Sequence, residues 1–257
     1  MTSAEIRDAY DESADAWAAG PEPVYARLAV ALVTAAPVPV RGARVLDLGA
    51  GTGVASRAAV AAGAARVVGV DIAEGMLRRS ASACAPVLGD AVALPFGAAT
   101  FDLVLAACCL DHLPDPVRVL REARRVATAV VASAFPANWT HPAKTAVEDA
   151  LVPLGFRPPD WYVTFKRDRE ARVGAPDALA ALARAAAYPH VAVHVAEVAT
   201  GLDTPAALAS WRFGMAHVAP FVRTLDPARQ SALRRAAEDA LVGAPPLVVP
   251  LIVLVAS

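Results

Sequence analysis

The chain has 257 residues, a length that fits one large α/β domain. Its 24 lysine and arginine residues nearly balance 25 acidic residues, and no segment collects a basic tract, so nucleic acid is not expected as a partner. Hydrophobic residues reach 56%, but no window approaches the roughly 18 unbroken apolar residues that a membrane span needs.

The first residues are polar and acidic, without the basic start and apolar middle of a secretory signal, so we expect a cytoplasmic protein. Thr2 and Glu5 have the spacing of a capping box, and Ile6 and Trp17 belong to a set of apolar residues that recur at helical intervals. This pattern predicts a first helix. A second helix is expected at about residues 24–35.

Residues 45–53 form an apolar run that ends in an acid and then breaks into three alternating glycines. Valine and leucine suit a central parallel strand, and the glycines allow a tight turn whose backbone can approach a ligand. The alanine-rich residues 54–62 should begin a helix whose N-terminus faces that ligand. A dinucleotide loop would need glycine at the position of Val54, so an NAD(P) dehydrogenase is disfavoured.

A second strand is expected at residues 66–71, and it ends in Asp71, 20 residues after Gly51. At this interval a carboxylate on the neighbouring strand can accept hydrogen bonds from both ribose hydroxyls of an adenosine. The same carboxylate can instead cap the next helix. A short apolar segment at residues 85–88 follows.

Later strands are expected at residues 101–107, 129–134, 190–198 and 247–256, with a helix from Pro116 to residue 126. The end of the strand at 101–107 should reach the crevice where open α/β sheets bind ligands. Pro250 cannot donate to a central ladder, so we expect a bulge there or a strand that begins after it.

Two longer segments separate these strands. Residues 136–188 should contain helices that start near Pro142 and at Pro176. Residues 204–242 contain Thr204 and Asp226, each a capping residue followed by proline, which predicts two helices. An ordinary crossover would be far shorter, so these segments are expected to roof the active site and to set the substrate.

The pattern D-x-G-x-G-x-G at Asp47, Gly49, Gly51 and Gly53 resembles the glycine motif of class I S-adenosyl-L-methionine (SAM)-dependent methyltransferases. Residues 89–96 resemble the G-D-A-x-x-L-P-F stretch of the branch of small-molecule enzymes that includes the ubiquinone/menaquinone-biosynthesis type. The resemblance is strong up to about residue 135. Beyond that point only the order of elements carries it.

The resemblance implies an α/β, Rossmann-like, doubly wound sheet of seven strands, mostly parallel with an antiparallel seventh strand, plus helical cap insertions. One domain is expected over residues 1–257. Residues 1–40 would form N-terminal helices, residues 41–135 the cofactor-binding core, and residues 136–188 and 204–242 the substrate cap.

The resemblance also assigns roles to single residues. The expected SAM-binding residues are Asp47, Gly49, Ala50, Gly51, Gly53, Asp71, Ile72, Met76, Asp90, Ala91 and Cys108. Asp90 would bind the adenine amino group, although a turn role is the alternative. Tyr10 lies in a segment that resembles an element lying across the cofactor, but it can equally pack a helix onto the core.

Methyl transfer to an acidic nucleophile needs at most one base, and His112, at the end of the strand at 101–107, is the best-placed candidate. His141 and His217 compete with it, and a lone histidine is often structural. The acids and histidines are dispersed, so no metal site is expected, and the three cysteines indicate neither a zinc site nor a disulfide framework.

The expected function is SAM-dependent methyl transfer to an oxygen, carbon or nitrogen atom of a small, largely apolar metabolite, in a biosynthetic pathway. The alternatives are a SAM-binding enzyme that catalyses a cyclisation or rearrangement, and a non-catalytic SAM-binding module. We expect a monomer or homodimer that binds neither nucleic acid nor membrane. The sequence does not identify the substrate.

Overall fold

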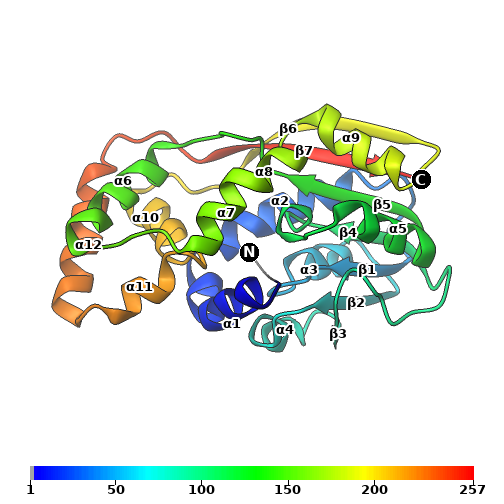
Figure 1. Cartoon of the computed structure of the whole chain (residues 1–257), viewed down its shortest axis with the longest axis horizontal. Coiled ribbons are helices and arrows are strands. Elements are labelled where there is room, and N and C mark those ends of the chain that lie inside the picture. The colour runs from blue at the N-terminus through cyan, green and yellow to red at the C-terminus, as the bar shows by residue number, and fades with distance from the viewer. Residues whose placement is uncertain (1–2) are drawn as a thin grey trace.

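The computed structural model describes residues 3–257, which form a seven-stranded sheet in the order β3-β2-β1-β4-β5-β7-β6 (Figure 1). The strands are β1 Arg44–Leu48, β2 Arg66–Asp71, β3 Ala85–Leu88, β4 Phe101–Ala106, β5 Ala127–Ala134, β6 Val191–Ala199 and β7 Val248–Ala256. Strands β1 to β5 pair in parallel, and β7 lies antiparallel between β5 and β6. The predicted Rossmann-like fold is confirmed.

Helices cover both faces of this sheet and extend beyond its edge. They are α1 Ser3–Ala19, α2 Glu22–Thr34, α3 Val54–Ala61, α4 Glu74–Ser80, α5 Pro116–Val126, α6 Pro142–Leu151, α7 Asp160–Asp168, α8 Glu170–Val173, α9 Pro176–Ala185, α10 Pro205–Phe213, α11 Ala219–Thr224 and α12 Pro227–Ala240, with the 3₁₀ turns η1 Leu110–His112 and η2 Val152–Leu154. The predicted cap at Thr2 lies outside the described residues. In the described part of the chain, no helix combines the length and the apolar character that crossing a membrane demands.

Alternate side chains of the central strands enter two separate cores, one on each face of the sheet. On β4, Leu103 and Leu105 join one core, whereas Val104 and Ala106 join the other. This alternation explains why β4 is apolar at nearly every position, since a parallel strand covered on both faces has no side that contacts water.

The expectation for Pro250 is wrong, because β7 begins at Val248 and continues through the proline without a bulge, with Glu197 opposite Pro250. Ser257 and His190 exchange both backbone hydrogen bonds, so the odd-numbered residues of β7 direct their N–H groups to β6. Position 250 therefore faces the β5 side, where pairing has already ended at Ile252. The missing N–H costs no ladder bond there.

The helices of segments 136–188 and 204–242 differ in part from their prediction. Thr204 and Asp226 accept hydrogen bonds from Ala207 N and Arg229 N and cap α10 and α12 as expected. Between these two helices the described chain forms a further short helix, α11, which has no side-chain cap. Helix α9 packs against β6 and β7, so the end of segment 136–188 covers the sheet and not the site.

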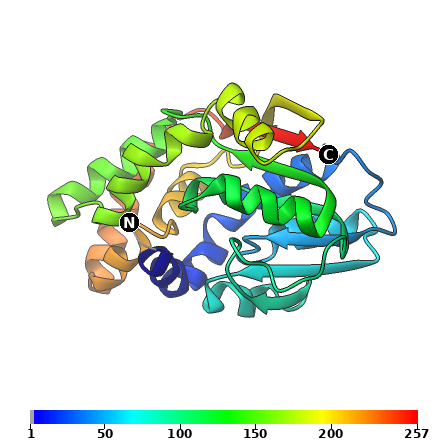
Figure 2. The same cartoon turned by 45° about the vertical axis from the view of Figure 1, so that its right-hand side comes forward.

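Figure 1 shows α6, α7, α10, α11 and α12 together at one end of the molecule, to the left of the sheet. In Figure 2 the dark-blue helix α1 lies between this group of helices and the cyan helices that flank β1 and β2. The N-terminal helix thus lies where the β1–β2 half of the fold meets this group of helices.

Candidate functional site

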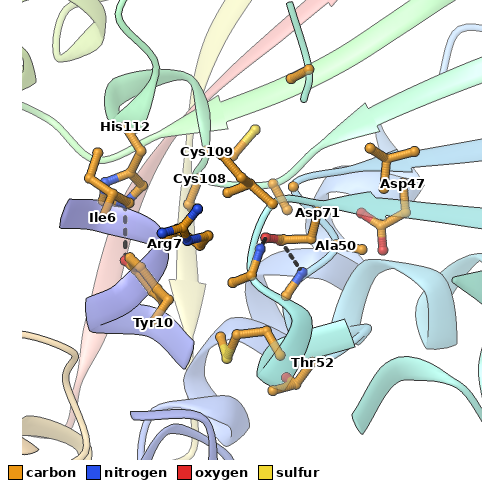
Figure 3. A pocket seen from close by; sticks show the side chains of 18 of the residues that line it. Ile6, Arg7, Tyr10, Asp47, Ala50, Thr52, Asp71, Cys108, Cys109 and His112 are labelled. Carbon is orange, nitrogen blue, oxygen red and sulfur yellow. Dashed lines mark hydrogen bonds between the residues drawn. The ribbon is translucent and has the colours of Figure 1, made fainter. Parts of the chain in front are cut away.

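A pocket lies at the carboxyl ends of β1, β2 and β4, with α1 forming the opposite wall (Figure 3). It is lined by residues predicted from the sequence: Tyr10, Asp47, Gly49, Ala50, Gly51, Asp71, Ile72, Met76, Asp90, Ala91, Cys108 and His112. It is also lined by residues that the sequence did not single out, among them Ile6, Arg7, Trp17, Tyr25, Cys109 and Leu113. Gly53 and His141, which were also predicted, are not among its lining residues.

The three glycines after β1 serve different purposes, although all have positive φ. A Cβ on Gly51 would meet only the Met76 methyl group, at 3.6 Å, so this position leaves open space in the pocket. A Cβ on Gly49 would lie 2.7 Å from Cys109 Cβ, and one on Gly53 would lie 2.9 Å from Ser80 Cβ. Gly53 therefore lets α3 start close to α4, a packing role, whereas Gly51 keeps the pocket wall clear.

Asp71 ends β2 and holds the glycine loop in place. Its Oδ2 accepts a hydrogen bond from Gly51 N at 2.8 Å, and its Oδ1 accepts one from Ala73 N at 2.9 Å. Burial raises the pKa of this carboxyl, and the backbone donors oppose the rise. Each oxygen keeps a second lone pair for a ligand, because a carboxylate offers about four acceptor sites. Asp71 can therefore hold the loop and still accept hydrogen bonds from a ligand.

Asp47, at the end of β1, is a buried carboxyl with one satisfied and one unsatisfied oxygen. Its Oδ2 accepts hydrogen bonds from Ser56 N at 2.8 Å and Ser56 Oγ at 2.6 Å. Its Oδ1 has no partner among the described residues, and Asp47 lines the pocket. A ligand with N–H donors at this point would satisfy the orphaned oxygen.

Burial raises the pKa of Asp47 to about 6, against the opposing effect of Ser56. Because the folded state then binds this proton more tightly than the unfolded chain, ionised Asp47 destabilises the fold above pH 6, and the penalty decreases progressively as the pH falls from 6 towards the usual aspartate pKa of about 4. We expect the free energy of unfolding of the wild type, relative to Asp47→Asn, to rise by about 1 to 3 kcal/mol between pH 7.5 and pH 4.5. Urea unfolding at both pH values measures this; a difference that is flat, or that grows with pH, would contradict the assignment.

Tyr10 and His112 meet across the pocket, from α1 and from the turn that follows β4 (Figure 3). Tyr10 Oη lies 3.1 Å from His112 Nε2. The His112 ring stacks on Phe165 of α7 with a centroid distance of 4.8 Å, and Asp111 Oδ1 lies 3.9 Å from Nε2. Tyr10 also packs on Trp17, so this side chain both lines the pocket and contacts a small hydrophobic core.

Asp90 and Ala91 line the same pocket near Ile72 and Met76. Asp90 Oδ1 also accepts a hydrogen bond from Val92 N at 3.1 Å, so the turn role considered from the sequence is present as well. At the end of β4, the Cys108 N–H group donates to Ser133 Oγ at 3.2 Å. Cys108 adopts a positive φ of 49°, which turns the chain towards the pocket.

The structure assigns His141 to helix capping. Its Nδ1 accepts a hydrogen bond from Ala143 N at 3.1 Å at the start of α6, and its Nε2 lies 3.2 Å from the carbonyl oxygen of Pro245. Both ring nitrogens are thus engaged away from the pocket. Its expected role as a base therefore has no geometric support. The sequence could not show this, because a histidine before Pro142 looks the same whether it caps a helix or acts as a base.

The aromatic residues of the two cap segments do not line this pocket either. Trp211 and Phe213 belong to a hydrophobic core, and Trp139 packs against it. In the described residues, no cluster of three or more histidines, cysteines or acids is placed to hold a metal ion.

Residues 46–129 match the family model described as "Methyltransferase domain". The demethylmenaquinone methyltransferase of Clavibacter sepedonicus is 38% identical over 128 residues, 48% of this chain and 50% of that protein. That of Streptomyces griseus subsp. griseus is 32% identical over 197 residues, 71% of this chain and 83% of that protein. The matches to the first three curated relatives span about half of the relatives' own length.

A solved structure described as a putative methyltransferase from an antibiotic biosynthesis pathway of Anabaena variabilis superposes with a TM-score of 0.61 at 15% identity. The match covers 90% of this chain and 96% of that one, and at this identity it shows the fold.

Three features of this chain together define a class of SAM-binding folds. They are a sheet with β7 antiparallel between β5 and β6, a glycine loop after β1, and an acid at the end of β2. The chain belongs to the class I SAM-dependent methyltransferases of the ubiquinone/menaquinone type. The residues present fit the family's cofactor. Gly51 leaves space, Asp71 keeps free lone pairs for ribose hydroxyls, and Asp47 Oδ1 lacks the donor that an ammonium group would supply.

Proposed function

We propose that this protein transfers the methyl group of SAM to a small, largely apolar molecule, and that Tyr10 and His112 accept the proton of the acceptor. The observation that carries the proposal is the Tyr10 Oη to His112 Nε2 contact of 3.1 Å within the pocket that Gly51 and Asp71 also line. Residues 41–135 would hold the cofactor, and the cap segments 136–188 and 204–242 would enclose the acceptor.

When bound, SAM supplies an activated methyl group on a sulfonium, so the protein has to exclude water and align the acceptor. Such positioning contributes about 7 to 11 kcal/mol in favourable model systems. Ile6, Tyr10 and Trp17 of α1 provide apolar surface over the pocket for this purpose. No covalent enzyme intermediate is required.

The pair is arranged for a proton relay. Burial, reinforced by Asp111 and Asp71, raises the pKa of Tyr10 far above its usual value, so the phenol stays protonated at neutral pH. It can pass its proton to His112 Nε2 while it accepts the proton of the acceptor. This role requires the histidine tautomer with hydrogen on Nδ1. The charge of Asp111, 3.9 Å from Nε2, would stabilise the resulting imidazolium.

The first acceptor to test is demethylmenaquinone, since curated relatives carry that name, followed by a panel of aromatic metabolites. Incubation with SAM labelled in its methyl group, followed by mass spectrometry, shows whether the label appears on the acceptor. An acceptor that is consumed without taking up label would show a rearrangement and would contradict methyl transfer.

With an acceptor in hand, His112→Ala and Tyr10→Phe are expected to lower kcat by roughly 10²-fold, because each removes one member of the relay. The affinity for S-adenosylhomocysteine, measured by calorimetry, should stay close to that of the wild type. His194→Ala, at an exposed position on β6, is the matched histidine control. Unchanged turnover with a lower melting temperature would show that the pair only packs α1 onto the sheet.

A further inference from the structure

Basic side chains gather beneath the cap helices, away from the pocket described above. Lys144 lies on α6, Lys166 on α7 and Arg212 on α10. Helix α6 packs on α10, and Tyr162 of α7 stacks on His217, just after α10, with a centroid distance of 3.6 Å. Figure 1 shows these helices together at the left end of the molecule.

Arg212 is a buried cation, since only 3% of its surface is exposed. One terminal nitrogen, Nη2, donates to Glu148 Oε1 at 3.1 Å and lies 3.4 Å from His217 Nε2. Its Nε is buried and has no hydrogen-bond partner among the described residues. Glu148 is 46% exposed, so water weakens the neutralisation that it provides.

Among residues 3–257, no acid pairs directly with Lys144. Its Nζ donates to the carbonyl oxygen of Trp139 at 2.7 Å and lies 4.0 Å from the centroid of the Trp139 ring. Burial, and then the charges of Arg212 and Lys166, lower its pKa to about 7, against the opposing effect of Glu170 and Glu148. Lys144 thus lies in a region of excess positive charge.

The balance of charge in this cluster favours an anion. Lys166 pairs with Glu170 at 2.5 Å, and Arg212 pairs with Glu148, which leaves Lys144 as the uncompensated cation of this set. Burial, followed by Arg212, Lys166 and Lys144, lowers the pKa of His217, so that ring stays neutral and adds no further positive charge. A partly buried cation without an anionic partner carries a desolvation cost, and a bound anion would offset it.

Aromatic rings lead from the cofactor pocket to this cluster along two routes. On one route, Tyr162 packs on Phe165, which stacks on His112 at the pocket. On the other, Trp139 beneath Lys144 stacks on Phe135, which contacts Tyr25 of the pocket wall. Neither Lys144 nor Arg212 lines the pocket, so a flat acceptor with its reacting atom near His112 would reach the basic cluster by entering between these packed rings.

We propose that Lys144 and Arg212, supported by Lys166, bind a carboxylate carried by an aromatic methyl acceptor. This inference rests on the proposed function, because it names the class of acceptor for the same site. The carboxylate would take donors from Lys144 Nζ and from Arg212 Nε. The Trp139 and Tyr162 rings would flank the apolar body of the molecule.

The test compares 1-naphthoate with its neutral analogue 1-naphthamide, by calorimetric titration of the full chain saturated with S-adenosylhomocysteine. Lys144→Gln and Arg212→Gln should each weaken naphthoate binding by at least about tenfold and leave naphthamide binding unchanged. Arg235→Gln, at an exposed position on α12, makes the same change in net charge and should bind naphthoate as the wild type does.

A pH series with the wild type and Lys144→Arg keeps the proposal testable if Arg212→Gln fails to fold. The charged groups around Lys144 are Arg212, Lys166, Glu170 and Glu148, and burial lowers the pKa of the Lys144 ammonium to about 7. Naphthoate affinity of the wild type should therefore fall between pH 6 and pH 8.5. In Lys144→Arg it should stay constant over that range, because a guanidinium does not titrate there.

The inference is overturned if the two probes bind the wild type equally, if naphthoate does not bind, or if Lys144→Gln retains wild-type affinity. Binding of S-adenosylhomocysteine is measured separately in the same protein. If S-adenosylhomocysteine binds and naphthoate does not, only the carboxylate site is rejected. If S-adenosylhomocysteine does not bind, the proposed function itself is rejected.

Discussion

Gly51→Val is expected to abolish detectable SAM binding while the protein stays folded. Gly51 has a φ of 54°, and a side chain there would enter open pocket space next to the Met76 methyl group. Steric exclusion at the centre of the pocket cannot be relieved by a small side-chain rotation, because the loop is held by the Asp71 bond to Gly51 N. Calorimetric titration with S-adenosylhomocysteine measures the loss.

The matched control for this substitution is Gly155→Val. Gly155 also has a positive φ, 89°, and a Cβ there would meet no atom within 4 Å, away from the pocket. Both variants bear the backbone strain of a β-branched residue in the left-handed region, about 1 to 2 kcal/mol. Only Gly51→Val should lose the ligand; equal affinities in the two variants would place the cofactor elsewhere.

Asp71→Ala should weaken SAM binding by roughly 10- to 150-fold, which corresponds to about 1.5 to 3 kcal/mol for a hydrogen bond to a charged group. The substitution also frees Gly51 N and Ala73 N from their acceptor, so the glycine loop loses an anchor in addition to the ligand contact. The loss should therefore lie towards the upper end of that range.

Asp115→Ala is the matched control, because Asp115 also accepts from a backbone N–H, that of Arg118, but caps α5 outside the pocket. It should lower stability by about 1 kcal/mol and leave SAM affinity unchanged. If a folded Asp71→Ala protein bound SAM as tightly as Asp115→Ala does, the ribose role of Asp71 would be rejected.

The cofactor half of the fold could be predicted from sequence because its signals are local. An apolar strand, a glycine loop and a strand-end acid occur within short stretches, and the expected bounds of β2 agree with the structure. The topology of β7 followed from the resemblance. Pro250 was misjudged because the side on which its missing N–H would point depends on where the neighbouring strand β5 ends.

The wall of the pocket could be predicted only in part. Trp17 and Tyr25 line it, yet in sequence they look like the buried faces of the first two helices, and only the packing of α1 and α2 brings them to the end of β4. Conversely, Trp211 lies in segment 204–242, which was expected to roof the active site, but its side chain is in the core and only 2% exposed. Aromatic composition does not reveal which face of a helix meets a cavity.

The basic cluster under the cap was not anticipated for a related reason. Lys144, Lys166 and Arg212 are far apart in the chain and unremarkable in a sequence with 24 basic residues. Their proximity depends on how α6, α7 and α10 pack, and no short motif encodes it.

The pocket at the ends of β1, β2 and β4 is expected to bind SAM. The most direct test is calorimetric titration of the wild-type protein with S-adenosylhomocysteine and, in parallel, with NAD⁺. We expect one site per chain for S-adenosylhomocysteine and no binding of NAD⁺ at the same concentrations. Absence of S-adenosylhomocysteine binding, or comparable affinity for NAD⁺, would contradict it.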